Sequence, residues 1–202
     1  MDKPADSKVT DLIGYVGVKA PQFSYSRLKG ADPISYVEMA STGEVACLGE
    51  DVNEAFLKSI ISTGFKLPRG DVLLSIKGDK NRFRFLESAL KLREMNFNIY
   101  ATEHTSEFLA NQGIKNTMVY KVHESKKPNI LEMLEERKFD LVMNISFDYG
   151  REEFEDEYKM RRLAVDFGIP LITNMQLAEL FVSALSKKKA EDLKIKAWDE
   201  YQ

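Results

Sequence analysis

The stretch Val72-Leu73-Leu74-Ser75-Ile76 decides the fold, because it is a short and almost wholly apolar run that stops at Gly78-Asp79. A run of this length and composition is typical of a strand that is buried on both faces. Apolar residues then recur at helical spacing over residues 85–90, which predicts a helix directly after the strand.

The same alternation of strand and helix continues to the end of the chain. Further strands are predicted at residues 97–101, 117–120, 141–143 and 169–172. Further helices are predicted at residues 106–112, 128–137, 158–167 and 175–187. Apolar strands that alternate with helices predict an α/β fold with a small, doubly wound parallel sheet.

The residues before Pro68 follow a different pattern. Short strands are predicted at residues 12–18 and 44–48, and Asp51 is placed to cap a helix that runs through Ile61. Lys19-Ala20-Pro21 is expected to follow the first of these strands. The chain therefore divides into a short α+β segment at residues 1–67 and the α/β domain at residues 68–202.

Composition excludes several classes of partner. The chain has 29 basic and 32 acidic residues and a net charge of -3, so no bulk charge draws it to nucleic acid or to an anionic membrane. No run is long and apolar enough to cross a bilayer. The single cysteine, Cys47, allows no internal disulfide and fits a reducing compartment. We expect a cytoplasmic protein, and a mitochondrial location stays open.

Polar side chains gather where the predicted strands end, which is where ligands bind in a parallel sheet. The hydroxyl, ammonium and amide groups at these ends belong to Lys80, Thr102, Thr105, Ser106, Lys121, Asn144 and Ser146. Hydroxyls at a helix start, together with two ammonium groups, suit an anion such as a phosphate or carboxylate. Each charge-assisted hydrogen bond is worth roughly 1.5–3 kcal/mol.

A purely structural interpretation of the same residues stays open. Thr105 or Ser106 then caps its own helix, and both lysines are solvated. For any one residue this interpretation is as good as the binding one, and only the agreement of all the strand ends favours the site. The two histidines, His104 and His123, lack a partner at metal-ligand spacing, so neither a metal site nor a catalytic histidine is expected.

Several motifs resemble one enzyme family. VKAPQFS at residues 18–24, GADP at residues 30–33 and EMASTGEVA at residues 38–46 resemble the end of the second ATP-grasp half of carbamoyl phosphate synthetase. RRLAVDFGIP at residues 161–170 is similar to the last domain of the eukaryotic members. The resemblance implies that residues 1–67 are a remnant of that synthetase half. It also implies that residues 68–202 are the methylglyoxal-synthase-like allosteric domain of the large chain.

The resemblance also implies a ligand. The nucleotide-site positions of the family match Lys80, Thr102, Thr105, Lys121, Asn144 and Ser146 in this sequence. The implied effector is a nucleotide such as UMP, UTP or IMP, or alternatively N-acetylglutamate. Members activated by N-acetylglutamate carry a tryptophan where this chain has Lys121, which favours a phosphate-bearing ligand.

No catalytic residue and no cofactor are expected within this chain. In the family, ATP and Mg or Mn bind to the synthetase halves, and the implied partners are the remainder of the synthetase and a glutaminase subunit. The pathway, pyrimidine or arginine synthesis, stays open. One alternative is a free-standing methylglyoxal-synthase-like lyase acting on a small phosphate ester, although Asp148 lacks the glycine neighbours of that enzyme's catalytic aspartate. Another is self-association through an apolar face of residues 1–65.

Overall fold

The computed structural model describes residues 14–34, 41–121, 123–124, 126–146, 154–197 and 200–201. The chain opens with an antiparallel ribbon of β1 (Val16–Gln22) and β2 (Gly43–Gly49), followed by α1 (Val52–Ser62). An alternation then runs through β3 (Asp71–Ile76), α2 (Asp79–Glu94), β4 (Asn98–Thr102), α3 (Glu103–Asn111), β5 (Thr117–Val119), α4 (Ile130–Glu135), β6 (Leu141–Ile145), α5 (Phe154–Asp166), β7 (Leu171–Ile172) and α6 (Met175–Lys187). A short 3-10 helix, η1 (Ala190–Asp192), follows.

The predicted parallel sheet is confirmed. Its strand order is β5-β4-β3-β6-β7, and all four neighbouring pairs are parallel. The stretch that predicted the fold forms the central strand, in which Val72, Leu73 and Leu74 are fully buried. A central strand needs helices on both faces, since its side chains point alternately to either side.

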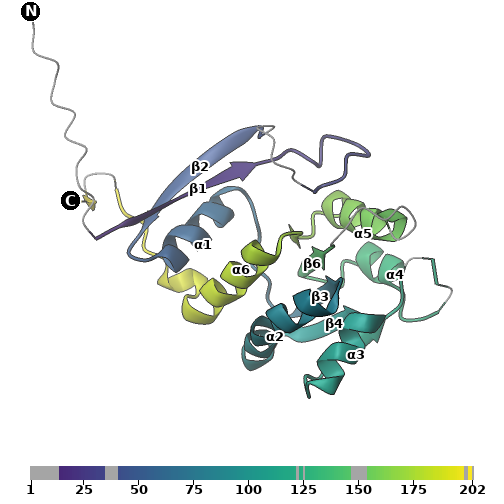
Figure 1. The fold of residues 1–202 in the computed structure, drawn as a ribbon. Coiled ribbons are helices and arrows are strands. Elements are labelled where there is room, and N and C mark those ends of the chain that lie inside the picture. Colours follow the sequence, from purple (N-terminus) through teal and green to yellow (C-terminus); the bar gives the residue numbers. More distant parts are fainter. Residues whose placement is uncertain are drawn as a thin grey trace, which may run out of the picture.

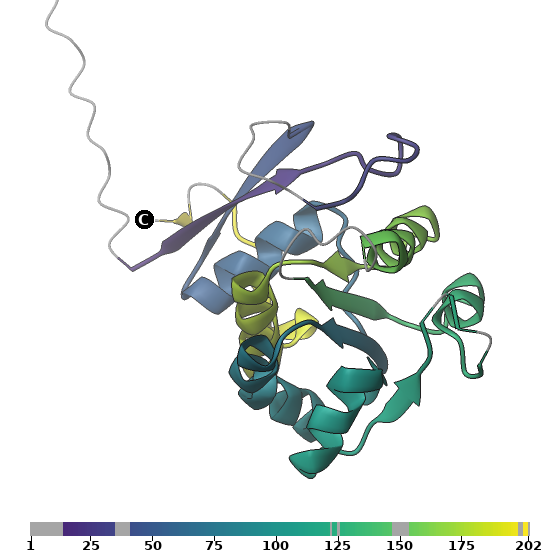
Figure 2. The same cartoon turned by 45° about the vertical axis from the view of Figure 1, so that its right-hand side comes forward.

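Two layers of helices cover the two faces (Figure 2). Leu73 and Val142 point to the face covered by α4 and α5, where Ile130 and Met160 complete one hydrophobic cluster. Val72 and Leu74 point to the opposite face, which is covered by α2, α3 and α6. This arrangement confirms the doubly wound fold.

The N-terminal ribbon and α1 form the predicted α+β segment, which lies beside α6 (Figure 1). Phe56 and Leu57 of α1 are buried in the same cluster as the side chains of α2 and α6. The hydrophobic core therefore runs across the predicted boundary between residues 67 and 68. The division of the chain at this boundary stays a prediction.

Element boundaries differ from the prediction at several points. β1 extends to Gln22, so Lys19-Ala20-Pro21 lies within the strand that it was expected to follow. Its pairing with β2, rather than apolar content, sets this boundary. Asp51 is the predicted N-cap of α1, because its carboxylate accepts hydrogen bonds from the N–H groups of Asn53 and Glu54, both at 2.9 Å. Among the described residues, no helix is long and apolar enough to span a bilayer.

Candidate functional site

The strand order creates a crevice at the carboxyl ends of β3 and β6. The chain leaves β3 toward β4 and β5 on one side of the sheet, and then crosses to β6 and β7 on the other side. The connections that follow β3 and β6 therefore diverge. Such a point of divergence in an open α/β sheet is the usual place for a ligand.

Three polar side chains form a row across this edge. Ser75 of β3 pairs in register with Asn144 of β6. The hydroxyl of Thr102, the last residue of β4, lies 3.5 Å from the Ser75 hydroxyl and 3.4 Å from the Thr105 hydroxyl. Both distances are at the long limit for hydroxyl hydrogen bonds, so they hold the Thr102 hydroxyl weakly. Ser75 was not among the predicted site residues, because it sits inside an otherwise apolar run.

The other two predicted hydroxyls have stronger partners. The Thr105 hydroxyl accepts the Ile76 N–H at 3.0 Å and donates to the Ile76 carbonyl at 3.2 Å, which ties α3 to the end of β3. The Ser106 hydroxyl donates to the side-chain carbonyl of Asn116 at 2.6 Å. Neither residue caps α3, because the helix begins at Glu103 and its N-cap is Thr102. The structural interpretation, in which Thr105 or Ser106 caps this helix, is therefore wrong about which residue holds the N-cap position.

Both predicted lysines lie at this edge. Lys80 is exposed in the first turn of α2, directly beyond β3. Lys121 is half-buried just beyond β5, where its N–H donates to the carboxylate of Glu124 at 2.8 Å. Ser146 is half-buried and directly follows β6. Because all five strands are parallel, their carboxyl ends bring these residues to one side of the molecule.

Asn144 is fully buried and is bound by an arginine that the sequence reasoning missed. Its side-chain carbonyl accepts a hydrogen bond from Arg161 at 2.8 Å, and its amino group lies 3.8 Å from the Met160 sulfur. Arg161 is itself fully buried. It went unnoticed because an arginine on an amphipathic helix normally points to solvent.

A second missed cation, Arg82, lies over the end of β3. Its guanidinium donates to the Ile76 carbonyl at 2.9 Å and to the Asp79 carboxylate at 2.6 Å. Its buried Nε atom has no hydrogen-bond partner among the described residues. This arginine brings further hydrogen-bond donors to the edge that holds Lys80 and Lys121, although Asp79 balances its charge.

Comparison with known protein families assigns most of the parallel sheet to one family. Residues 84–173, which run from α2 to just beyond β7, match the family model described as "MGS-like domain". The chain contains an MGS-like domain. This confirms the resemblance that the sequence motifs indicated.

The relatives of the whole chain are much longer proteins. The chain is 44% identical over 189 residues to "Multifunctional protein pyr1-3" from Dictyostelium discoideum, covering 91% of this chain and 8% of that protein. It is 45% identical over 186 residues to "Multifunctional protein CAD" from Squalus acanthias, covering 85% of this chain and 8% of that protein. It is 43% identical over 184 residues to the mitochondrial carbamoyl-phosphate synthase (ammonia) from Homo sapiens, covering 89% of this chain and 12% of that protein. The chain thus spans about a tenth of the length of the relatives it matches.

Among solved structures, the chain aligns with methylglyoxal synthase from Elizabethkingia anophelis. The TM-score is 0.41 at 16% identity, over 67% of this chain and 95% of that chain.

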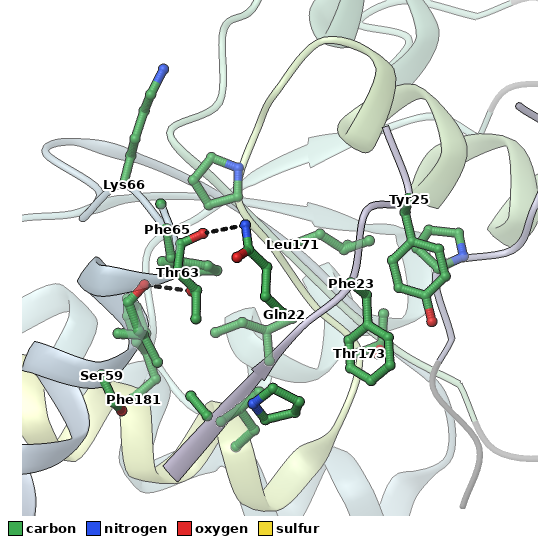
Figure 3. Close-up of a pocket in the computed structure, with 18 of the residues that line it drawn as sticks. Gln22, Phe23, Tyr25, Ser59, Thr63, Phe65, Lys66, Leu171, Thr173 and Phe181 are labelled. Carbon is green, nitrogen blue, oxygen red and sulfur yellow. Dashed lines mark hydrogen bonds between the residues drawn. The ribbon is translucent and has the colours of Figure 1, made fainter. Parts of the chain in front are cut away.

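A large cavity lies elsewhere, at the junction of the N-terminal ribbon with the MGS-like domain (Figure 3). Its volume is about 930 Å³, and its lining comes from β1, α1, β7 and α6. On one wall, Gln22 donates to the Thr63 carbonyl at 3.4 Å, while Leu171 and Phe181 supply apolar surface. None of the seven predicted site residues lines this cavity.

The expectations about a metal site and about the lyase alternative concern the histidines and Asp148. The described part of the chain holds no group of three or more His, Cys, Asp or Glu side chains that is suited to a metal ion. His104 is exposed on α3, and His123 contacts Asp156 of α5. Asp148, on which the lyase alternative depends, lies outside the described residues.

Proposed function

We propose that this chain is the effector-binding, regulatory part of a carbamoyl phosphate synthetase and that it has no catalytic role by itself. The observation that carries the proposal is the carboxyl edge of the parallel sheet. There a weakly held hydroxyl, a helix start and several cations lie around the divergence of the β3 and β6 connections.

The ligand that fits this edge is a small anion. Thr102 stands at the N-terminus of α3, where free backbone N–H groups favour negative charge. Lys80 and Lys121 supply ammonium groups from beyond the ends of β3 and β5, the two strands that flank β4 in the sheet. A nucleotide such as UMP, UTP or IMP carries the phosphate that these groups suit, and N-acetylglutamate offers carboxylates as the alternative.

The named relatives support the synthetase assignment. They are one carbamoyl-phosphate synthase and two multifunctional proteins, and the chain matches only a small share of each. In the proposed assembly, the partners are the remainder of the synthetase and a glutaminase subunit. The product is carbamoyl phosphate for pyrimidine or arginine synthesis, and the effector adjusts its formation.

Isothermal titration calorimetry tests the proposal on the chain itself. UMP, UTP, IMP and N-acetylglutamate are titrated separately at low ionic strength, with uridine as the neutral control. At least one of the anions is expected to bind, and uridine is expected to bind more weakly because it lacks the phosphate. Absence of heat from all four anions, checked by a thermal-shift assay, contradicts the proposed function.

A further inference from the structure

A buried arginine joins the proposed effector site to the N-terminal part of the chain. The guanidinium of Arg161 donates to the Asn144 carbonyl at 2.8 Å, and to the two carboxylate oxygens of Asp32 at 2.8 and 2.6 Å. Its side chain is 0% exposed, whereas Asp32 is 20% exposed. The planar fork of an arginine makes such a two-point contact with a carboxylate both strong and directional.

Asp32 belongs to a loop that α5 holds along its whole length. Residues 25–32, here called the clasped loop, connect β1 with the following segment and reach over α5 (Figure 1). Arg162 donates to the carbonyls of Tyr25, Leu28 and Ala31, each at 3.1 Å. The Tyr158 hydroxyl donates to the Gly30 carbonyl at 2.9 Å. One face of α5 therefore binds the backbone of this loop, and Arg161 of the same helix also contacts the effector edge.

In the series Asp32, Arg161 and Asn144, each side chain restricts the orientation of the next. A buried guanidinium needs anionic partners, and Asp32 meets this need at closer range than the Glu157 carboxylate, which lies 3.7 Å away. Because Arg161 binds the Asn144 carbonyl, it fixes which way the amide points. The amino group of Asn144 then faces the Met160 thioether, which is only a weak acceptor, so Arg161 is the stronger of the two contacts that orient this side chain.

We propose that Arg161 is a positioning residue that links occupancy of the effector site to docking of the clasped loop. This inference rests on the proposed function, and it adds the route by which a bound anion is communicated. With the loop docked, Asp32 holds Arg161, and Arg161 holds Asn144 in one orientation beside Ser75, at the edge where the ligand is proposed to bind. By thermodynamic reciprocity, a ligand that favours this orientation also favours the docked loop.

The test uses Asp32→Asn, which keeps the size of a partly exposed side chain and leaves Arg161 the nearby Glu157 carboxylate, whereas Arg161→Met removes a fully buried side chain and risks unfolding. Glu44→Gln is the matched control: it removes one charge from the same N-terminal part, where Glu44 pairs with Lys19 at 2.7 Å on the surface. UMP and N-acetylglutamate are titrated into wild type and both variants by calorimetry. Thermal unfolding confirms that each variant is folded.

A second readout follows the loop itself. Trypsin cleaves after Arg27 and Lys29, which are both exposed within the clasped loop. The bound ligand is expected to slow cleavage there in wild type, and to slow it less in Asp32→Asn. Asp32→Asn is expected to weaken binding about tenfold, within the usual range of coupling between sites. Glu44→Gln is expected to leave affinity and cleavage unchanged.

The outcomes separate this inference from the proposed function. If wild type binds and Asp32→Asn binds equally well, the link through Arg161 is wrong and the effector site stands. Equal protection of the loop by ligand in wild type and in Asp32→Asn also contradicts the link. If wild type binds neither of these probes, and binds neither UTP nor IMP in the titrations described above, both the link and the proposed function are overturned.

Discussion

The Thr102 hydroxyl offers a way to separate binding from folding. Its two neighbours, the hydroxyls of Ser75 and Thr105, lie at 3.5 and 3.4 Å, so Thr102→Val breaks only weak hydrogen bonds. The substitution keeps the shape of a side chain that is 5% exposed. We expect a stability loss of no more than about 1 kcal/mol, which lowers the Tm of a chain of this size by about 2–4 °C.

The same hydroxyl is expected to matter far more for the ligand. A hydrogen bond to a charged group contributes roughly 1.5–3 kcal/mol, which corresponds to about a tenfold to 100-fold change in Kd. Calorimetry with UMP is therefore expected to show at least tenfold weaker binding by Thr102→Val. Thermal unfolding of the same sample measures the stability loss.

Ser106→Ala gives the opposite pattern and serves as the comparison. Its hydroxyl donates to Asn116 at 2.6 Å, so its removal leaves an acceptor unpaired and costs roughly 1–3 kcal/mol of stability. Affinity for UMP is expected to stay within about twofold of wild type, a difference of only about 0.4 kcal/mol. Normal affinity in Thr102→Val, or equal losses of affinity in both variants, would refute the assignment of Thr102 as the binding hydroxyl.

Three further changes test the account. Lys121→Ala is expected to weaken UMP about tenfold while leaving uridine unaffected, because only UMP carries charge; equal losses by calorimetry would exclude the contact. One carboxylate oxygen of Asp140 accepts hydrogen bonds from the N–H groups of residues 69, 70 and 71 at 3.2, 2.7 and 3.0 Å. Asp140→Ala is therefore expected to lower the free energy of unfolding, measured in urea, by about 3 kcal/mol. Unchanged stability would contradict this anchoring role. The Glu54 N–H and then Lys188 lower the pKa of Asp51 in the folded chain. The stability gained from this depressed pKa is present above the unfolded pKa of about 3.9 and is lost as pH falls through the folded pKa. Asp51→Asn, which keeps the cap, is therefore expected to be less stable than wild type at pH 7, and this difference is expected to shrink as pH falls below about 3.9 toward the folded pKa; a difference that stays constant with pH would argue against it.

The sheet was predictable because its strands are recognised by local apolar content. Buried parallel strands such as β3 and β6 need apolar residues on both faces, and this requirement is visible in a few consecutive residues. The boundaries were less predictable. α3 begins at Glu103, directly after the last residue of β4, because Thr102 is both the end of the strand and the N-cap position of the helix, and no apolar periodicity marks that first turn.

The candidate site could be predicted only as a set of strand ends. The rule that ligands bind beyond parallel strands led to Thr102, Lys121 and Asn144 without any contact being known. The arginine that binds Asn144 was not found, because its partner Asp32 lies 129 residues away along the chain. A buried charge is explained by such long-range partners, and nothing in the helix that carries Arg161 indicates them.

The central claim is that a small anion binds at the carboxyl edge of the sheet and not in the junction cavity. Two-dimensional NMR of the isotope-labelled chain during a UMP titration tests it most directly. The largest amide shifts are expected at residues 102–105, at Lys121 and at residues 145–146. Shifts concentrated at Gln22, Phe65 and Thr173, which line the cavity, would contradict it.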